Sequence, residues 1–192
     1  MFIVIEGLDG VGKSTITKAL AIEIDAVILA TPGAKFNNIR SELELIYKDN
    51  HQARQLFYMS TVVNISEQAR ELINKGKNVI VDRYWLSTQV YHQWKSENHH
   101  FGLADVENSL LVPDVTLYLQ LPLEQRKQRL LSRKNNTTED NLTLIEAIDI
   151  ELNNLYLQYS ATSITGKWVK VDTSKTIDEI VNNICKELKE FK

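Results

Sequence analysis

Residues 7–14, with the sequence GLDGVGKS, constrain the fold more than any other part of the chain. An apolar run at residues 2–5 precedes them, and a segment of helical spacing at 13–23 follows. Gly-x4-Gly-Lys-Ser between a strand and a helix is the phosphate-loop pattern, in which backbone N–H groups turn inward around phosphate oxygens. The alternative is a glycine-rich turn that binds nothing. We expect a nucleotide-phosphate site made by Gly7, Leu8, Asp9, Gly10, Val11, Gly12, Lys13, Ser14 and Thr15.

Short apolar runs rich in β-branched residues alternate along the chain with longer segments of helical spacing. This alternation predicts an α/β fold, a parallel sheet with helices on both faces. Together with the phosphate loop it predicts a three-layer P-loop NTPase fold with five parallel strands. The expected strands are residues 2–5, 26–29, 79–81, 115–121 and 168–171. The expected helices are residues 13–23, 53–74, 123–133, 138–159 and 177–188.

Length and composition limit the class of protein. A chain of 192 residues with 43% hydrophobic residues suits one domain over 1–192. The net charge of -3 argues against a nucleic-acid or anionic-membrane surface. We find no apolar run near the roughly 20 residues of a membrane span and no signal segment, and only one cysteine, Cys185. We therefore expect a cytoplasmic protein without nucleic-acid or membrane partners.

A second motif, VDRYW at residues 81–85, follows the third apolar run. Asp82 and Arg83 would then lie at the carboxyl end of a buried strand, where open α/β sheets bind ligands. Asp82 can hold the waters of a magnesium ion, and Arg83 can clamp a phosphate with two hydrogen bonds. A surface ion pair is the alternative. The chain carries no Asn-Lys-x-Asp guanine-reading segment, which argues against a GTP-specific switch.

A third cluster, Arg126, Arg129 and Arg133, has three- and four-residue spacing and lies on one face of a predicted helix. The helix runs into the polar stretch RKNNTTEDN, which predicts a mobile lid at about 132–141. Arginines that close over a transferred phosphoryl group would stabilise its charge and exclude water. A solvated basic face is the alternative.

The acceptor is inferred from the absence of a base. A nucleoside monophosphate is mostly dianionic at neutral pH, since its second pKa is about 6, and its attacking oxygen needs no deprotonation. The chain offers cations and a metal site for such an acceptor, and no histidine-centred device. We expect the four histidines to lie on the surface, with metal ligation by His99 and His100 as the alternative.

Several segments resemble the thymidylate kinase-like family of nucleoside monophosphate kinases in order and spacing: FIVIEGLDGVGKST, the Pro32-Gly33 pair, LFYMS, VDRYWLSTQVY, PDVTLYLQLPLEQRKQR and VDTSKTIDEI. The resemblance covers nearly the whole chain. VIVDRYW followed by STxxY, and RKQRLLSR, look most like the mitochondrial UMP/CMP kinase branch. The resemblance implies ATP as phosphoryl donor, Mg²⁺ as cofactor, and a homodimer packed through the helix at 53–74.

The resemblance also implies roles for single residues. Phe57 would stack on the base of the acceptor, Arg83 would contact its phosphate, and Asp9 would face the sugar or the metal. Tyr91, eight residues after Arg83 on the next helix, would pack beside the sugar and favour deoxyribose. Core packing is the alternative for Phe57 and Tyr91.

The implied catalytic residues are Lys13, Asp82, Arg83, Arg129 and Arg133, with Arg129 also at ATP. The implied acceptor residues are Asp9, Arg40, Phe57, Thr61, Arg83, Thr88 and Tyr91, and the implied metal ligands are Ser14 and Asp82.

The chain departs from the family pattern at two places. Thymidylate kinases usually carry Arg-Glu where this chain has Ala30-Thr31, and an arginine where it has Thr61. The first change removes a cation and the second removes a donor to the base, for which Arg40 is the candidate replacement. We expect an ATP-dependent kinase of a pyrimidine nucleoside monophosphate, dTMP by family default. The alternatives are UMP, CMP, dUMP or dCMP as acceptor, and a non-catalytic nucleotide-binding protein that kept the fold.

Overall fold

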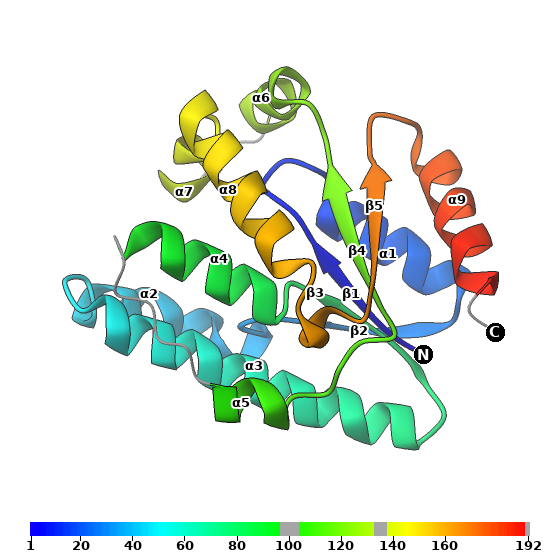
Figure 1. The fold of residues 1–192 in the computed structure, drawn as a ribbon, viewed down its shortest axis with the longest axis horizontal. Coiled ribbons are helices and arrows are strands. Elements are labelled where there is room, and N and C mark those ends of the chain that lie inside the picture. Colours follow the sequence, from blue (N-terminus) through cyan, green and yellow to red (C-terminus); the bar gives the residue numbers. More distant parts are fainter. Residues whose placement is uncertain (97–103, 133–137, 191–192) are drawn as a thin grey trace.

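A five-stranded sheet, parallel throughout, forms the centre of the protein (Figure 1). The computed structural model describes residues 1–96, 104–132 and 138–190. The strand order is β2-β3-β1-β4-β5, and the strands are β1 (Phe2–Glu6), β2 (Ala26–Ala30), β3 (Asn78–Asp82), β4 (Val115–Gln120) and β5 (Lys167–Asp172). Each of the five strands was predicted to within one residue at each end, and the predicted fold class is confirmed.

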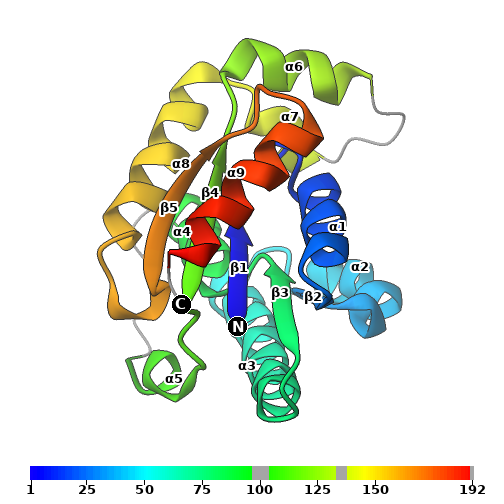
Figure 2. The ribbon, with the colours of Figure 1, turned by 90° about the vertical axis from the view of Figure 1, so that its right-hand side faces the viewer.

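Helices cover both faces of the sheet (Figures 1 and 2). Helices α1 (Lys13–Glu23) and α9 (Ile177–Lys189) lie on one face, and α3 (His51–Asn74), α4 (Trp85–Lys95) and α8 (Glu146–Tyr159) lie on the other. Because both faces are covered, all five residues of the central strand β1 are buried. The remaining helices are α2 (Asn37–Ile46), α5 (Ala104–Ser109), α6 (Leu123–Leu131) and α7 (Thr138–Leu142), with 3-10 turns at Ala34–Phe36 and Ser163–Thr165.

The helix predicted over 138–159 is wrong in one respect, because it is two helices, α7 and α8, broken at 143–145. Thr143 at the break is fully buried, and both its hydroxyl and its carbonyl accept hydrogen bonds from Arg126. A threonine whose carbonyl and hydroxyl accept hydrogen bonds from another side chain is less able to continue the backbone hydrogen bonds of a helix. The break is therefore a consequence of a long-range contact.

The sheet register brings three strand ends together. Ile5 of β1 pairs with Asp82 of β3, and Asp82 pairs with Ala30 of β2. The loop after β1 starts beside these residues, at the point where the strand order reverses direction. Ligands bind at such a switch point in open α/β sheets. Among the residues described, no helix is long and apolar enough to cross a membrane.

Candidate active site

A cavity of about 190 Å³ lies at the carboxyl ends of β1, β2 and β3. It joins the two motifs that the sequence analysis identified, since the loop after β1 forms one wall and the end of β3 forms the other. Two residues that end β2 complete it. The lining residues are Asp9, Gly10, Gly12, Lys13, Ser14, Ala30, Thr31, Asp82 and Arg83.

The loop after β1 needs glycine for steric reasons. Gly7 has φ +141°, and a Cβ there would lie 2.6 Å from the carbonyl oxygen of Leu119. Gly12 has φ +98° and is the N-cap of α1, where no side chain caps the helix. The N–H groups of the first helical turn are therefore available to an anion.

Lys13 is held inside the loop. Its Nζ donates to the carbonyl oxygens of Gly7 at 3.0 Å and Leu8 at 2.8 Å, and lies 3.6 Å from Oδ1 of Asp9. Burial, followed by the nearby charge of Arg83, lowers the pKa of Lys13 to about 8, although Asp9 opposes the change. The lysine thus provides a positive charge at the cavity that is sensitive to pH above neutrality.

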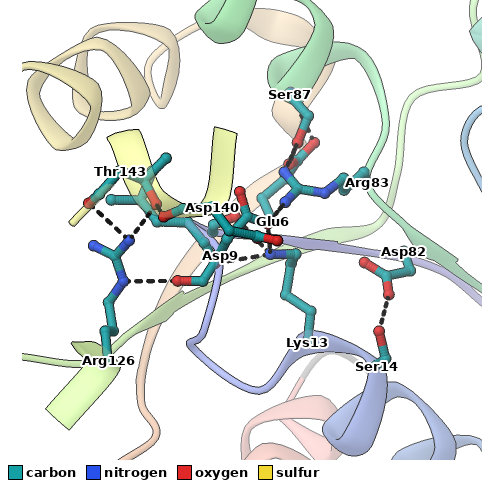
Figure 3. Close-up of polar contacts among 12 residues, drawn as sticks. Glu6, Asp9, Lys13, Ser14, Asp82, Arg83, Ser87, Arg126, Asp140 and Thr143 are labelled. Atoms are coloured by element: carbon teal, nitrogen blue, oxygen red, sulfur yellow. Dashed lines mark hydrogen bonds and ion pairs between the residues drawn. The ribbon is translucent and has the colours of Figure 1, made fainter. Parts of the chain in front are cut away.

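Asp9 connects the two walls of the cavity (Figure 3). Its Oδ1 forms an ion pair with Arg83, and its Oδ2 accepts a hydrogen bond of 3.0 Å from the Tyr91 hydroxyl. The Arg83 guanidinium also lies 5.4 Å from the centre of the Tyr91 ring. Burial alone would raise the pKa of Asp9, but Arg83 and then Lys13 outweigh it and hold that pKa well below its usual range. Asp9 is therefore a carboxylate shared by both cations.

The backbone of Arg83 is in the left-handed region, with φ +67°. This conformation is uncommon for a residue with a Cβ, and it persists where neighbours fix it. The Arg83 N–H donates to the carbonyl of Ile5 at 3.0 Å, and the Thr31 hydroxyl donates to the carbonyl of Arg83 at 2.8 Å. Thr31, which departs from the family pattern, therefore supports the backbone of Arg83.

Ser14 and Asp82 face each other across the cavity (Figure 3). The Ser14 hydroxyl donates to Oδ2 of Asp82 at 3.1 Å, and Oδ1 of Asp82 is buried without a hydrogen-bond partner in the described part of the chain. The same part of the chain holds no cluster of three or more His, Cys, Asp or Glu side chains that suits a metal. Two oxygen donors fit an ion that takes its other ligands from phosphate and water, as Mg²⁺ does.

Arg126 does not lie on an exposed lid face, so that part of the prediction is wrong. Its side chain is 1% exposed and forms an ion pair with Asp149 of α8. Its Nε donates to the carbonyl of Asp9 at 2.8 Å, and another nitrogen donates to the carbonyl of Thr143 at 3.1 Å. Arg126 thus ties α6 and α8 to the phosphate loop. Its partners Asp149 and Thr143 were not predicted from the sequence.

Arg129, one turn further along α6, also reaches the phosphate loop. Its guanidinium donates to the carbonyl of Val11 at 3.2 Å and to that of Thr173, after β5, at 2.8 Å. Half of the predicted lid at 132–141, residues 133–137 with Arg133 among them, lies outside the described residues, and residues 138–141 belong to α7. His99 and His100 lie outside the described residues as well.

Two of the predicted acceptor residues, on α2 and α3, do not line the cavity. Phe57 of α3 packs edge-on against Phe36 at 5.9 Å between ring centroids and lies 5.2 Å from the ring of Tyr58. The Nε of Arg40 donates to Glu44 and to the Tyr58 hydroxyl, both at 3.0 Å. Arg40 is therefore already engaged in a local cluster.

Thr61 and Thr88 are buried, and neither lines the cavity. The Thr61 hydroxyl donates to the carbonyl of Tyr58 at 2.7 Å, so its side chain faces the protein interior. His92 of α4 is also buried and packs 5.6 Å from the Tyr58 ring, so the prediction that all four histidines are surface residues is wrong.

A buried carboxylate next to the site was not predicted from the sequence. Glu6, the last residue of β1, is fully buried and bonds to the start of α4 through Ser87 (Figure 3). A signal for it was present, because an acid stands at the end of the otherwise apolar run FIVIE.

Comparison with known proteins gives consistent matches. Residues 5–184 match the profile of a protein family described as thymidylate kinase. A probable thymidylate kinase of Methanococcus aeolicus is 28% identical over 194 residues, spanning 100% of this chain and 97% of the relative. A thymidylate kinase of Desulfotalea psychrophila is 26% identical, spanning 98% of this chain and 94% of the relative.

Two solved structures share the fold. A deoxyadenosine kinase from M. mycoides with bound dATP superposes with a TM-score of 0.71 at 19% identity, covering 98% of this chain and 100% of that one. A thymidylate kinase from Candida albicans superposes with a TM-score of 0.69 at 22% identity, covering 98% and 91%.

Proposed function

The chain belongs to the thymidylate kinase family, and we propose that it transfers the γ-phosphoryl group of ATP to a pyrimidine nucleoside monophosphate, with dTMP as the first candidate. One observation carries the proposal. Asp9 contacts both Lys13 of the phosphate loop and Arg83 at the end of β3. A cation for the donor phosphates and a cation for the acceptor phosphate are thus joined through one carboxylate in one cavity.

On the donor side, the N–H groups of the loop and of the first turn of α1 cradle the phosphates of ATP, and Lys13 provides the charge at the outer phosphates. Arg129 steadies this loop through the carbonyl of Val11 and adds positive charge on the ATP side. Arg133 keeps its predicted role as a cation of the lid.

On the acceptor side, Arg83 binds the phosphate of the monophosphate. This phosphate replaces Asp9 as the partner of the Arg83 guanidinium. The acceptor oxygen is already ionised near neutral pH, so positioning and charge neutralisation are sufficient for its attack. Phosphoryl transfer needs little covalent chemistry from the protein, and this set of side chains meets that need.

Ser14 and Asp82 would hold Mg²⁺. The buried Oδ1 of Asp82, without a partner among the described residues, is the observation that favours this role. When bound, the ion supplies charge that neutralises the phosphate oxygens of ATP.

The base and the sugar of the acceptor are proposed from the family. Phe57 stacks on the base, and Tyr91, which contacts both Arg83 and Asp9, lies beside the sugar. Thr61 is buried and gives its only hydroxyl hydrogen to the carbonyl of Tyr58, so it offers no donor to thymine, and the Nε of Arg40 is engaged by Glu44 and Tyr58. UMP, CMP, dUMP and dCMP therefore stay as alternative acceptors.

A homodimer of this single cytoplasmic domain belongs to the same proposal. Helices α2 and α3 expose large apolar side chains, and water contact with such side chains is costly when they gather on one pair of helices. A two-fold contact through these helices would cover Ile39, Leu45, Ile46 and Leu56.

The proposal is tested by a coupled assay of ADP release with ATP and Mg²⁺ against dTMP, dUMP, UMP, CMP, dCMP, AMP and GMP. We expect ADP release that depends on a pyrimidine monophosphate, fastest with dTMP. Faster turnover of UMP or CMP would assign the chain to the alternative acceptors. No acceptor-dependent release, with ATP still bound, would favour a non-catalytic nucleotide-binding protein.

A further inference from the structure

Glu6 lies directly before the phosphate loop, and its carboxylate reaches Ser87, which also contacts the Arg83 guanidinium (Figure 3). Its carboxylate is completely buried and contacts residues from two helices, Ser87 of α4 and Tyr156 of α8. One side chain therefore links the strand that leads into the donor site with the helix that follows the acceptor cation.

The first oxygen of Glu6 caps α4. Oε1 accepts hydrogen bonds from the backbone N–H groups of Tyr84 at 3.0 Å and Ser87 at 3.2 Å. Tyr84 is the N-cap of α4 and supplies no side-chain cap of its own. The first turn of a helix leaves N–H groups unsatisfied, and a carboxylate there is favoured by the helix dipole. Glu6 thus fixes the start of α4 to β1.

The second oxygen of Glu6 orients the hydroxyl group of Ser87. Oε2 accepts from the Ser87 hydroxyl, and the Tyr156 hydroxyl lies 3.0 Å from the Ser87 oxygen and 3.5 Å from Oε2. A serine hydroxyl has one hydrogen, so a Ser87 that donates to Glu6 keeps its lone pairs for other donors. The Arg83 guanidinium takes one of these lone pairs, with its NH1 3.2 Å from the Ser87 oxygen.

Arg83 is consequently held at two points. Its NH1 contacts Ser87, and its NH2 pairs with Asp9. Asp9 has to give way if an acceptor phosphate binds Arg83, whereas the Ser87 contact can remain. Burial, the largest effect, raises the pKa of Glu6, and the hydrogen bonds from Ser87 and Tyr84 oppose this change. The two N–H groups at Oε1 can only donate, so this oxygen stays an acceptor in either protonation state.

We propose that Glu6, acting through Ser87, is a positioning residue for Arg83 that sets the direction of its guanidinium and its spacing from the phosphate loop. The inference rests on the proposed function, because the positioning matters for an acceptor phosphate. Correct placement of a reacting group contributes strongly to phosphoryl transfer, and a small displacement at such a site costs much of the rate.

Glu6→Gln tests the polarity of this network. The glutamine has nearly the same size, but either orientation of its amide turns an NH₂ group toward donors: toward the N–H groups of Tyr84 and Ser87, or toward the Ser87 hydroxyl. In the second case the Ser87 hydroxyl accepts from the glutamine NH₂ and turns its hydrogen away from residue 6, toward Tyr156, so that its lone pairs are shared between the glutamine and Arg83. We expect KM for the acceptor monophosphate to rise by about 10-fold, the scale of one lost hydrogen bond to a charged group, and kcat to fall. KM for ATP should stay within about twofold.

Ser87→Ala removes the link and should change the same two constants in the same direction, even if Glu6→Gln fails to fold. The matched control is Thr116→Val. Thr116 of β4 is also fully buried, and its hydroxyl donates to the carbonyl of Thr165, away from Arg83. This control should lower stability while leaving both KM values and kcat near those of the wild type.

Calorimetric titration of dTMP into each folded variant gives a readout that does not need turnover. Weaker dTMP binding by Glu6→Gln or Ser87→Ala, with unchanged ATP binding, supports the positioning role. Unchanged acceptor affinity, KM and kcat in Ser87→Ala, or equal losses for both substrates, would overturn it. A wild type that binds dTMP without phosphorylating it would contradict the proposed function. The dTMP affinities of the wild type and the variants would still test the positioning role of Glu6. A wild type that binds no pyrimidine monophosphate would contradict both.

Discussion

At the scale of single residues, Asp9 joins the two cations of the site. It neutralises Arg83 by an ion pair, lies 3.6 Å from the ammonium of Lys13 and accepts a hydrogen bond from Tyr91. A phosphate that enters must compete with this carboxylate for both cations. The same residue therefore keeps the cations in place without substrate and makes their release depend on substrate.

Lys13 leads to a prediction about pH. Burial and Arg83 lower its pKa to about 8, so Lys13 loses its charge as the pH rises through 8 when no ATP is added. ATP phosphates favour the charged form, so binding above pH 8 requires uptake of a proton. We expect ATP affinity to be constant below about pH 7.5 and to weaken at higher pH, by up to about tenfold per pH unit. Calorimetry in two buffers of different ionisation enthalpy at pH 8.5 measures the proton uptake. A pH-independent affinity up to pH 9.5 would show that Lys13 stays charged.

Tyr91 leads to a prediction about the sugar. Its hydroxyl contacts Asp9 and its ring contacts Arg83, so the ring stands beside the place where Arg83 would hold a phosphate. A ring packed there leaves no room for a 2′-hydroxyl. We expect the wild type to prefer dUMP over UMP and dCMP over CMP. Tyr91→Ala should lower the ratio of kcat/KM for the deoxy acceptor to that for the ribo acceptor by about one to two orders of magnitude, as expected when a steric pocket is opened.

Tyr91→Phe is the control, because it removes the contact to Asp9 and keeps the ring. Its deoxy preference should remain close to that of the wild type. If Tyr91→Ala leaves the ratios unchanged, the ring has a packing role alone.

At the scale of elements, α6 and α8 are tied to the phosphate loop through the buried Arg126. Loss of this guanidinium leaves the carbonyl of Thr143 without its donor and breaks a buried ion pair with Asp149. We expect Arg126→Met to lower the free energy of unfolding by about 3 kcal/mol, the scale for one partner lost from such a pair. Urea denaturation measures it. Lys127→Met on α6, a lysine whose ammonium pairs with Glu124 at the surface, should change stability by less than about 1 kcal/mol. Equal losses for both variants would contradict the structural role of Arg126.

The sequence predicted the strands well but did not predict where every helix ends. The strands were predicted because a buried parallel strand is a short apolar run with local signals. Lys13, Asp82 and Arg83 were found because two motifs carry them to strand ends. The break between α7 and α8 was not predicted, since Arg126 causes it from a distant segment.

The same limit explains the error at Arg126 and the omission of Glu6. Spacing alone places Arg126 on a basic helical face, and only the fold shows that Asp149 and the loop carbonyl of Asp9 meet it. A helix capped by a side chain from another strand, as α4 is by Glu6, has no local sequence signature. Contacts between residues far apart in the chain are thus the part that periodicity and motifs do not reveal.

At the scale of the whole molecule, the exposed apolar side chains of α2 and α3 predict self-association. Leu45 is 74% and Ile46 is 71% exposed, and both would be covered in a two-fold contact. We expect sedimentation velocity to show a dimer for the wild type and a monomer for Leu45→Glu. Ile150→Glu, on α8 and similarly apolar and exposed, is the control and should remain dimeric. A wild type that sediments as a monomer at micromolar concentrations would contradict this contact.

The whole site combines a donor half after β1 with an acceptor half after β3, and phosphoryl transfer between them is the central claim. The most direct measurement follows the label from [γ-³²P]ATP in the presence of dTMP and Mg²⁺. The wild type should form labelled dTDP in equal amount to ADP. Lys13→Ala should reduce kcat by at least about 10²-fold, the scale of one preorganised charge, and Arg83→Ala should also raise KM for dTMP. Lys18→Ala, an exposed lysine on the same helix α1, should match the wild type. Label that appears as inorganic phosphate whether or not dTMP, UMP or CMP is present, or a Lys13→Ala variant as active as the wild type, would contradict the account.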